Sequence, residues 1–235
     1  MRTIIIGDIH GCSKALDAVI RLAGPNPGRD RLVFLGDLFD RGPDSFGVLQ
    51  RVRQLSDRFG NDFILLLGNH EDYLLQTKLS RRQHMIWERV GRQATVESFE
   101  CAGQHMEDSI PWLKEHIRLY WKTKHFQCVH AGLKVDPPEV NDLETLVHSH
   151  EIVMMNRYAG LLTITGHIAL EKATWYAGDG MTVKEYEEKG PYPLPETGII
   201  CIDTGCGKGG KLTAMIVEDD HFSLLSATEN GIAEQ

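Results

Sequence analysis

Six acidic, amide and imidazole side chains that could hold metal ions occur in short clusters along the chain. They are Asp8, His10, Asp37, Asn69, His130 and His167. Oxygen and imidazole donors together suit manganese, iron or zinc, whereas a cage of oxygen atoms alone would suit magnesium or calcium. The number of donors is sufficient for two ions. We expect Asp8 and His10 to hold one ion. Asn69, His130 and His167 would hold the other, and the two oxygens of Asp37 would bridge them.

Two divalent ions roughly 3.5–4 Å apart polarise a phosphoryl oxygen and generate hydroxide from water at neutral pH. This chemistry supplies a nucleophile without a serine or cysteine. A leaving alkoxide also needs a proton, which His70 could donate while Asp40 orients its imidazole. Arg41 offers a planar guanidinium for two phosphate oxygens, and Arg157 is a candidate for a second phosphate contact.

The elements that must position these residues are short apolar strands. Thr3–Ile6, Leu32–Leu35 and Phe63–Leu67 each end at a glycine that is followed by Asp or Asn. Ligands of α/β proteins collect at the carboxyl ends of strands, where loops from several strands converge. The polar clusters are therefore expected to meet at one edge of a sheet.

The rest of the chain predicts one α/β domain over residues 1–235, with two sheets and helices outside them. Helices are expected at Ser13–Leu22, with Ser13 as N-cap, and at Ser45–Leu55. Between about 71 and 118, few glycines or prolines and no strand alternation indicate a helical insertion. Most of the second half is expected to be strand, with a frayed tail from Glu229 to Gln235. The predicted strands of that half are 126–129, 161–164, 199–202, 212–217 and 221–225.

The net charge, the apolar runs and the cysteines of the chain indicate which partners and which cellular compartment to expect. The formal net charge of −8 disfavours binding to nucleic acid or to an anionic membrane surface. Apolar runs such as Phe63–Leu67 are far shorter than the roughly 20 residues of a membrane helix. The chain also begins without the apolar segment of a signal peptide, and its five cysteines lack CxxC pairs, so we expect a cytoplasmic protein with reduced thiols.

The clusters GDIHG, GDLFDRG and GNHE, in this order, resemble the motifs of the phosphoprotein phosphatase family of calcineurin-like metallophosphoesterases. CVHAG at 128–132, TGH at 165–167 and IDTGCGKGGKLTAM at 202–215 extend the resemblance over nearly the whole chain. The resemblance implies a metallophosphoesterase-type four-layer β-sandwich of two mixed sheets flanked by helices. It also implies a dinuclear metal centre, and manganese is the ion to which bacterial relatives usually respond.

The family pattern places its metal ligands on the six residues given above, its general acid on His70 paired with Asp40, and a phosphate-binding arginine on Arg41. MNRYAG at 155–160 makes Arg157 the choice for the second arginine. Two branches fit, namely bacterial and phage protein Ser/Thr phosphatases and symmetrical dinucleoside tetraphosphatases. Asp40 and Glu71 favour the first, because the second branch tends to have Ala and Asp at these positions.

The expected activity is therefore hydrolysis of phosphoserine or phosphothreonine by direct attack of a metal-bound hydroxide, so the partner is a phosphoprotein or a nucleotide. The alternative is cleavage of dinucleoside polyphosphates such as diadenosine tetraphosphate into nucleoside diphosphates. A catalytically silent module that recognises phosphorylated partners would be expected to lack a ligand, and none is missing.

Several residues allow a structural as well as a functional interpretation. Aromatic and basic residues of the insertion, among them Trp87 and Phe99, would line a substrate groove or pack the core of a helical cap. The segment HSHE at 148–151 resembles a metal site, but a solvated helix end is the expected role.

Overall fold

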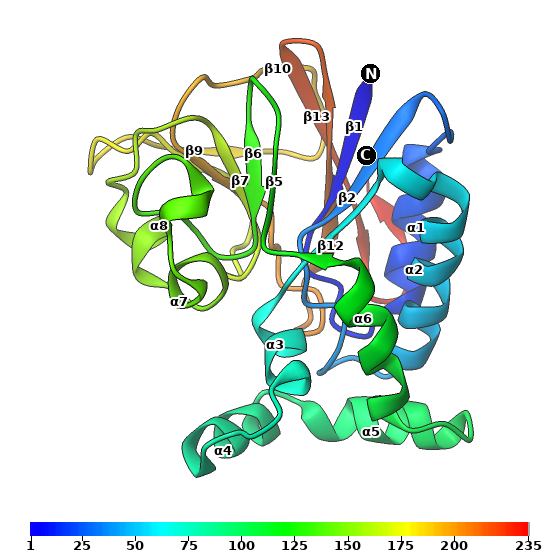
Figure 1. Cartoon of the computed structure of the whole chain (residues 1–235). Helices are drawn as coiled ribbons and strands as arrows, with labels where there is room; N and C mark the ends of the chain where they lie inside the picture. Colours follow the sequence, from blue (N-terminus) through cyan, green and yellow to red (C-terminus); the bar gives the residue numbers. More distant parts are fainter. Residues whose placement is uncertain (235) are drawn as a thin grey trace.

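Two mixed β-sheets packed face to face form the centre of the computed structural model, which describes residues 1–234 (Figure 1). The first sheet contains β1 (Arg2–Ile6), β2 (Asp30–Phe34), β3 (Phe63–Leu66), β4 (Ile117–Arg118), β10 (Tyr192–Pro193), β12 (Lys211–Glu218), β13 (His221–Thr228) and β14 (Ala233–Glu234). Its order is β10-β13-β12-β1-β2-β3-β4, and β14 pairs with β13.

The second sheet has six strands in the order β5-β6-β7-β11-β8-β9. They are β5 (Tyr120–Lys122), β6 (Gln127–Val129), β7 (Thr163–Thr165), β8 (Ala173–Tyr176), β9 (Val183–Tyr186) and β11 (Ile199–Cys201). Strands β1, β2 and β3 are parallel neighbours in the first sheet, and β6 and β7 are parallel neighbours in the second. Each sheet therefore has a set of carboxyl ends that point the same way.

Helices cover the outer faces of both sheets. Helices α1 (Ser13–Ala23) and α2 (Ser45–Phe59) pack on the first sheet, and α7 (Leu143–Val147) and α8 (Glu151–Met155) pack on the second. The insertion contributes α3 (Asn69–Leu75), α4 (Arg81–Arg89), α5 (Arg92–Cys101) and α6 (Ile110–His116), and α4 and α5 lie beyond one end of the sheets (bottom of Figure 1). Short 3₁₀ turns occur at Gly60–Asp62, Met106–Ser109 and Pro138–Val140.

The sequence of β1 explains its central place. Because side chains alternate between the faces of a strand, Ile4 and Ile6 pack toward α1 and α2 while Ile5 packs between the sheets. A strand buried on both faces needs a continuous apolar run, which the three isoleucines supply. After β1, helix α1 buries Leu16 and Val19 and ends at Gly24, whose left-handed backbone lets its N–H bond the Ile20 carbonyl.

The predicted fold class is confirmed, with two mixed sheets between layers of helices. The predicted hairpin of β12 and β13 is also present. Two predictions are wrong. Ser13 is not the N-cap of α1 but the first residue of this helix. The N-cap is Cys12, whose side chain makes no capping hydrogen bond. The tail is not frayed at Ala233–Glu234, because β14 pairs with β13; Gln235 lies outside the described residues. Within residues 1–234, none of the helices is both long and apolar enough to span a bilayer.

Candidate metal centre

The predicted metal ligands lie just beyond the carboxyl ends of five strands, five of them in loops and Asn69 at the start of α3. They are Asp8 and His10 after β1, Asp37 after β2, Asn69 after β3, His130 after β6 and His167 after β7. The first sheet thus provides four of them and the second sheet provides two. Parallel pairing within each sheet brings these loops to one end of the sandwich.

Contacts between side chains join the ligands from the two sheets. The main-chain N–H of His167 donates to Oδ2 of Asp8 at 2.9 Å. The Oδ1 atom of Asn69 lies 2.9 Å from Nδ1 of His167 and 3.1 Å from Nε2 of His130. One amide oxygen from the start of α3 and two imidazole nitrogens from two separate loops therefore point toward the same place.

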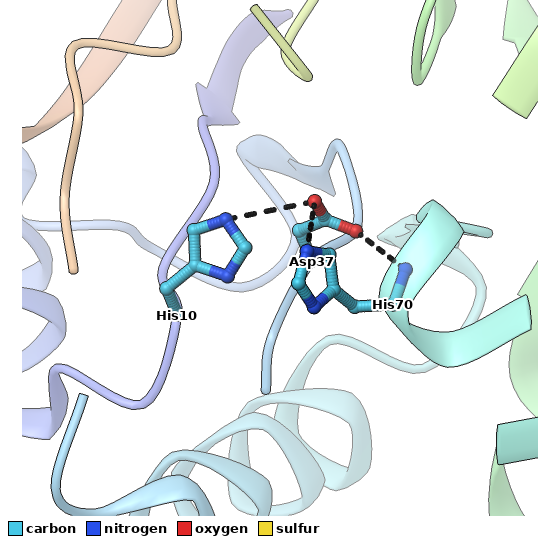
Figure 2. A group of neighbouring side chains, drawn as sticks. All are labelled: His10, Asp37 and His70. Atoms are coloured by element: carbon cyan, nitrogen blue, oxygen red, sulfur yellow. Dashed lines mark hydrogen bonds and ion pairs between the residues drawn. The ribbon is translucent and has the colours of Figure 1, made fainter. Parts of the chain in front are cut away.

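Asp37 lies at the centre of the cluster. Its Oδ2 atom is 3.6 Å from Nε2 of His10 and 3.9 Å from Nε2 of His70, and Figure 2 shows a dashed line from this oxygen to each imidazole. Its Oδ1 atom is 3.5 Å from Nε2 of His130. Within residues 1–234, two groups of acidic and imidazole ligands could hold a metal ion, and Asp37 belongs to both: His10, Asp37 and His70, and Asp37, His130 and His167. This geometry supports a bridging role for Asp37.

Backbone carbonyls orient three imidazoles of the cluster. Nδ1 of His10 bonds the Phe39 carbonyl at 2.8 Å, Nδ1 of His130 bonds the Leu35 carbonyl at 2.8 Å, and Nε2 of His167 bonds the His148 carbonyl at 3.2 Å. A carbonyl can only accept, so the bonded nitrogen carries the proton of a neutral ring. The other nitrogen presents its lone pair to the cluster, as in proteins whose histidines bind metal.

Asp8 supplies further support for a cation. Its Oδ1 atom is buried and has no hydrogen-bond partner among the described residues, although a buried carboxylate oxygen is costly to leave unpaired. A metal ion is a natural partner for this oxygen. Burial raises the pKa of Asp8 well above its ordinary range, and the nearby carboxylates of Asp203 and Asp37 raise it further, so a cation would stabilise its ionised form. The sequence did not indicate a role for Asp203, because the IDTG segment has no second potential ligand at a spacing typical of a metal site.

The other ligands have the protonation that metal binding requires. Burial opposes ionisation of Asp37, but the imidazoles of His130, His70 and His10 hold its pKa below the usual range. Burial lowers the pKa of His10 and of His130, and it lowers that of His167 to about 2. The imidazoles are therefore neutral at pH 7 and keep a lone pair for a metal. These donors fit two divalent cations.

Backbone strain is concentrated at this site. Seven described residues other than glycine have a positive φ, and five of them belong to the predicted site: His10, Asp37, Asp40, Arg41 and His167, with φ between 46° and 71°. Such conformations cost of order 1–3 kcal/mol each and persist where the surrounding structure enforces them. Their coincidence with the predicted residues is independent support for a functional role.

His70 and Asp40 form the predicted pair. Nδ1 of His70 donates to Oδ2 of Asp40 at 2.6 Å, so Nε2 of the same ring faces Asp37. The Arg41 guanidinium bonds Nε2 of His10 and lies 3.2 Å from Nε2 of His70. The Arg41 guanidinium and Nε2 of His70 thus border the cluster on the side where a phosphate oxygen could be bound.

Arg157 lies apart from this cluster. It is exposed after α8, where it lines a surface pocket with Ser149 and Met155. The structure does not bring its side chain into contact with the candidate ligands, and its role as a second phosphate contact stays a prediction.

Two further residues make contacts that the sequence did not predict. His148 is not a solvated helix end, because its Nε2 atom lies 2.8 Å from Oδ2 of Asp72 and its ring is half-buried. Glu71 is fully buried, and its two oxygens accept the backbone N–H groups of Asp37 and Leu38 at 2.8 and 2.9 Å. Glu71 thereby fixes the loop that carries the bridging carboxylate.

Comparison with known proteins agrees with this geometry. The calcineurin-like phosphoesterase family model matches residues 1–200. The chain is 35% identical over 152 residues to a symmetrical bis(5'-nucleosyl)-tetraphosphatase of Coxiella burnetii, covering 64% of this chain and 47% of that protein. A protein of the same name from Acidovorax sp. is 34% identical over 169 residues, which cover 69% of this chain and 55% of the relative. The chain thus spans about half the length of the curated relatives it matches.

Solved structures support the fold. A metallophosphoesterase from Sphaerobacter thermophilus superposes with a TM-score of 0.66 at 18% identity, covering 100% of this chain and 89% of the other. A protein serine/threonine phosphatase from Saccharomyces cerevisiae gives a TM-score of 0.56 at 13% identity, with coverage of 96% and 79%. The named sequence relatives favour the tetraphosphatase branch over the protein phosphatase branch that Asp40 and Glu71 had suggested.

Proposed function

Because this chain belongs to the calcineurin-like phosphoesterase family, we propose that it is a hydrolase of phosphoric esters or anhydrides that works with two divalent cations. The observation that carries the proposal is the position of Asp37, which is shared by two groups of candidate ligands. We further propose that residues 1–235 form one domain, with the helices from about 71 to 118 as an insertion.

We propose that one cation is held by Asp8, His10 and Asp37, and the other by Asp37, Asn69, His130 and His167. Such cations polarise phosphoryl oxygens and lower the pKa of bound water. The mixed oxygen and nitrogen donors suit manganese, iron or zinc, and we propose manganese.

The chain's own residues would then bind and protonate the substrate. Arg41, whose guanidinium contacts His10 and His70, would present two N–H groups to phosphate oxygens and neutralise charge that develops there. His70 directs Nε2 toward the cluster, and as an imidazolium it would donate the Nε2 proton to the departing oxygen and become neutral, while its Nδ1–H stays bonded to Asp40. Both groups lie at the same edge of the candidate metal centre.

For the substrate, we propose a bis(5'-nucleosyl) tetraphosphate that is cleaved symmetrically into two nucleoside diphosphates. Support comes from the two relatives named above, which carry this activity in their names. A phosphoanhydride also presents charged oxygens on both sides of the scissile bond, which suits two cations and an arginine.

Phosphoserine or phosphothreonine in a protein is the second candidate substrate, and the His70–Asp40 pair favours it. An alkoxide is a far stronger base than a nucleoside diphosphate, so its departure depends more on a positioned acid. The His70–Asp40 pair would therefore accelerate the loss of an alkoxide more than the loss of a nucleoside diphosphate.

The test is a direct comparison of diadenosine tetraphosphate with a phosphoserine peptide, using protein loaded with manganese. Release of ADP at a much higher kcat/KM than release of phosphate from the peptide would support the first candidate. The reverse ranking would favour the second. Absence of turnover on both, and on a nitrophenyl phosphate, with metal content verified, would refute the proposed hydrolase.

A further inference from the structure

The helical insertion contacts the acid pair directly. The indole Nε1–H of Trp87, on α4, donates to Oδ2 of Asp40 at 2.7 Å. The hydroxyl of Thr95, on α5, donates to Oδ1 of Asp40 at 2.7 Å and accepts the Asp40 backbone N–H at 2.8 Å. Trp87 is therefore neither a residue of an open groove nor simply part of an apolar core, which were the two roles expected from the sequence.

From this geometry we infer that Trp87 and Thr95 are positioning residues for the general acid His70, an inference that rests on the proposed hydrolase function. Both oxygens of Asp40 are occupied, and Trp87 shares with His70 the oxygen Oδ2. Rotation of the carboxylate would break the bonds to both insertion residues. The His70 ring is thus held in one orientation, with Nδ1–H on Asp40 and Nε2 toward the cluster.

Thr95 also stabilises the backbone of Asp40. Asp40 has a φ of 71°, a conformation that non-glycine residues rarely adopt. The bond from its N–H to Thr95 favours this conformation, and Thr95 itself is completely buried and bonded to the Ser45 hydroxyl. The insertion therefore fixes both the main chain and the side chain of Asp40.

The Trp87 indole is itself held in place. Tyr73, which follows His70 on α3, stacks on it with ring centroids 6.1 Å apart, and the Arg92 guanidinium lies 5.0 Å from its centroid. The ring is 6% exposed. Aromatic and cation–π contacts of this kind restrict the ring without using its N–H, which is left for Asp40.

A purely structural explanation is that any buried carboxylate needs donors. It predicts that loss of either donor would lower stability and would affect all substrates equally. A positioning role predicts a selective loss, because a strongly basic leaving group depends on the acid and a nitrophenolate does not. The two explanations therefore differ in a measurable quantity.

The variants are Trp87→Phe, which keeps the aromatic packing, and Thr95→Val, which keeps the shape. Thr95→Ser restores the hydroxyl. Ser98→Ala is the matched control, because it removes a hydroxyl of the same helix that bonds the Phe46 N–H and does not contact Asp40. For Trp87→Phe and Thr95→Val, we expect kcat on an alkyl phosphate to fall about tenfold or more at unchanged KM. On nitrophenyl phosphate we expect a change below about twofold.

Thr95→Ser and Ser98→Ala should behave as the wild type on both substrates. An equal loss on both substrates, or a loss in Ser98→Ala as large as that in Thr95→Val, would overturn the inference. A metal-loaded wild type that is inactive on diadenosine tetraphosphate, on the phosphoserine peptide and on nitrophenyl phosphate would refute the proposed function instead.

Nitrogen-15 NMR of metal-free protein tests the positioning separately from turnover. We expect a slowly exchanging indole N–H that disappears in Trp87→Phe, and a His70 ring protonated at Nδ1. An indole proton that exchanges as fast as that of an exposed tryptophan would contradict the inference, whether or not the enzyme is active.

Discussion

Replacement of Gly36 by alanine tests whether the close approach of two strand ends forms the metal centre. Gly36 follows β2 and has a φ of 103°, a backbone conformation that L side chains rarely adopt. A Cβ atom at this position would lie 2.5 Å from the backbone nitrogen and 2.7 Å from the Cα atom of Gly68, which follows β3. Because backbone atoms cannot rotate away as a side chain can, the two strand ends would have to separate.

The expected cost combines two effects. A left-handed conformation costs about 1–2 kcal/mol for a residue with a Cβ, and overpacking against the backbone adds about 1–3 kcal/mol. The reduced entropy of the unfolded chain offsets about 0.4–1 kcal/mol of this. We expect a net loss of about 1–5 kcal/mol, or about 2–18 °C in Tm for a chain of this length. Separation of Asp37 from Asn69 should also weaken metal binding.

Gly28→Ala is the matched control, since Gly28 has a φ of 81° and no heavy atom lies within 4 Å of the point that a Cβ would occupy there. Gly28→Ala therefore has the same cost of a left-handed backbone as Gly36→Ala, but its Cβ atom does not overlap with other atoms. Calorimetric unfolding of both variants would give the stability difference, and isothermal titration with manganese would give the affinities. Equal Tm values and equal affinities for the two variants would show that the approach of Gly36 to Gly68 does not determine the site.

Three further predictions concern single side chains. Asp37→Asn should abolish the binding of both cations and turnover together, and a variant that retains two metal equivalents in elemental analysis would exclude the bridging role. His70→Asn should retain metal but slow hydrolysis of an alkyl phosphate by about 10²–10⁴-fold, and unchanged kcat on that substrate would contradict its assignment as the acid. Burial lowers the pKa of His148, but its bond to Asp72 and the charge of Asp72 outweigh burial and leave this pKa raised. The ion pair therefore stabilises the fold fully below about pH 6.5, and this contribution is lost as the pH rises through the raised folded pKa. His148→Gln should accordingly cost about 1 kcal/mol at pH 6 and little at pH 9 in urea unfolding, and a cost that grows with pH would refute this sign.

The ends of the central strands were predictable because the signal is local. The last three residues of β1, β2 and β3 are apolar, and a glycine followed by a polar residue comes shortly after each strand, so sequence alone places the ligands at strand ends. The hairpin of β12 and β13 was also predictable, because two apolar runs are separated there by a short polar segment. Short edge strands were missed; β9, for example, is mostly exposed and has no apolar alternation.

Contacts between distant segments were not predictable. The bond from Trp87 to Asp40 joins residues 47 positions apart, and that from His148 to Asp72 joins residues 76 positions apart. Neither pair has a characteristic spacing, because the packing of whole helices determines which side chains meet. Such contacts follow from the tertiary structure rather than from local pattern.

Because the ligands come from both sheets, metal binding should stabilise the packing of one sheet against the other. Cations held by Asn69 from one sheet and by His130 and His167 from the other would cross-link the two halves of the sandwich at one end. By mass action, an ion present at one hundred times its Kd raises the free energy needed to separate the two sheets by about 2.7 kcal/mol. Chelation should accordingly accelerate amide hydrogen exchange in β6 and β7 as well as in the loops that bear the ligands.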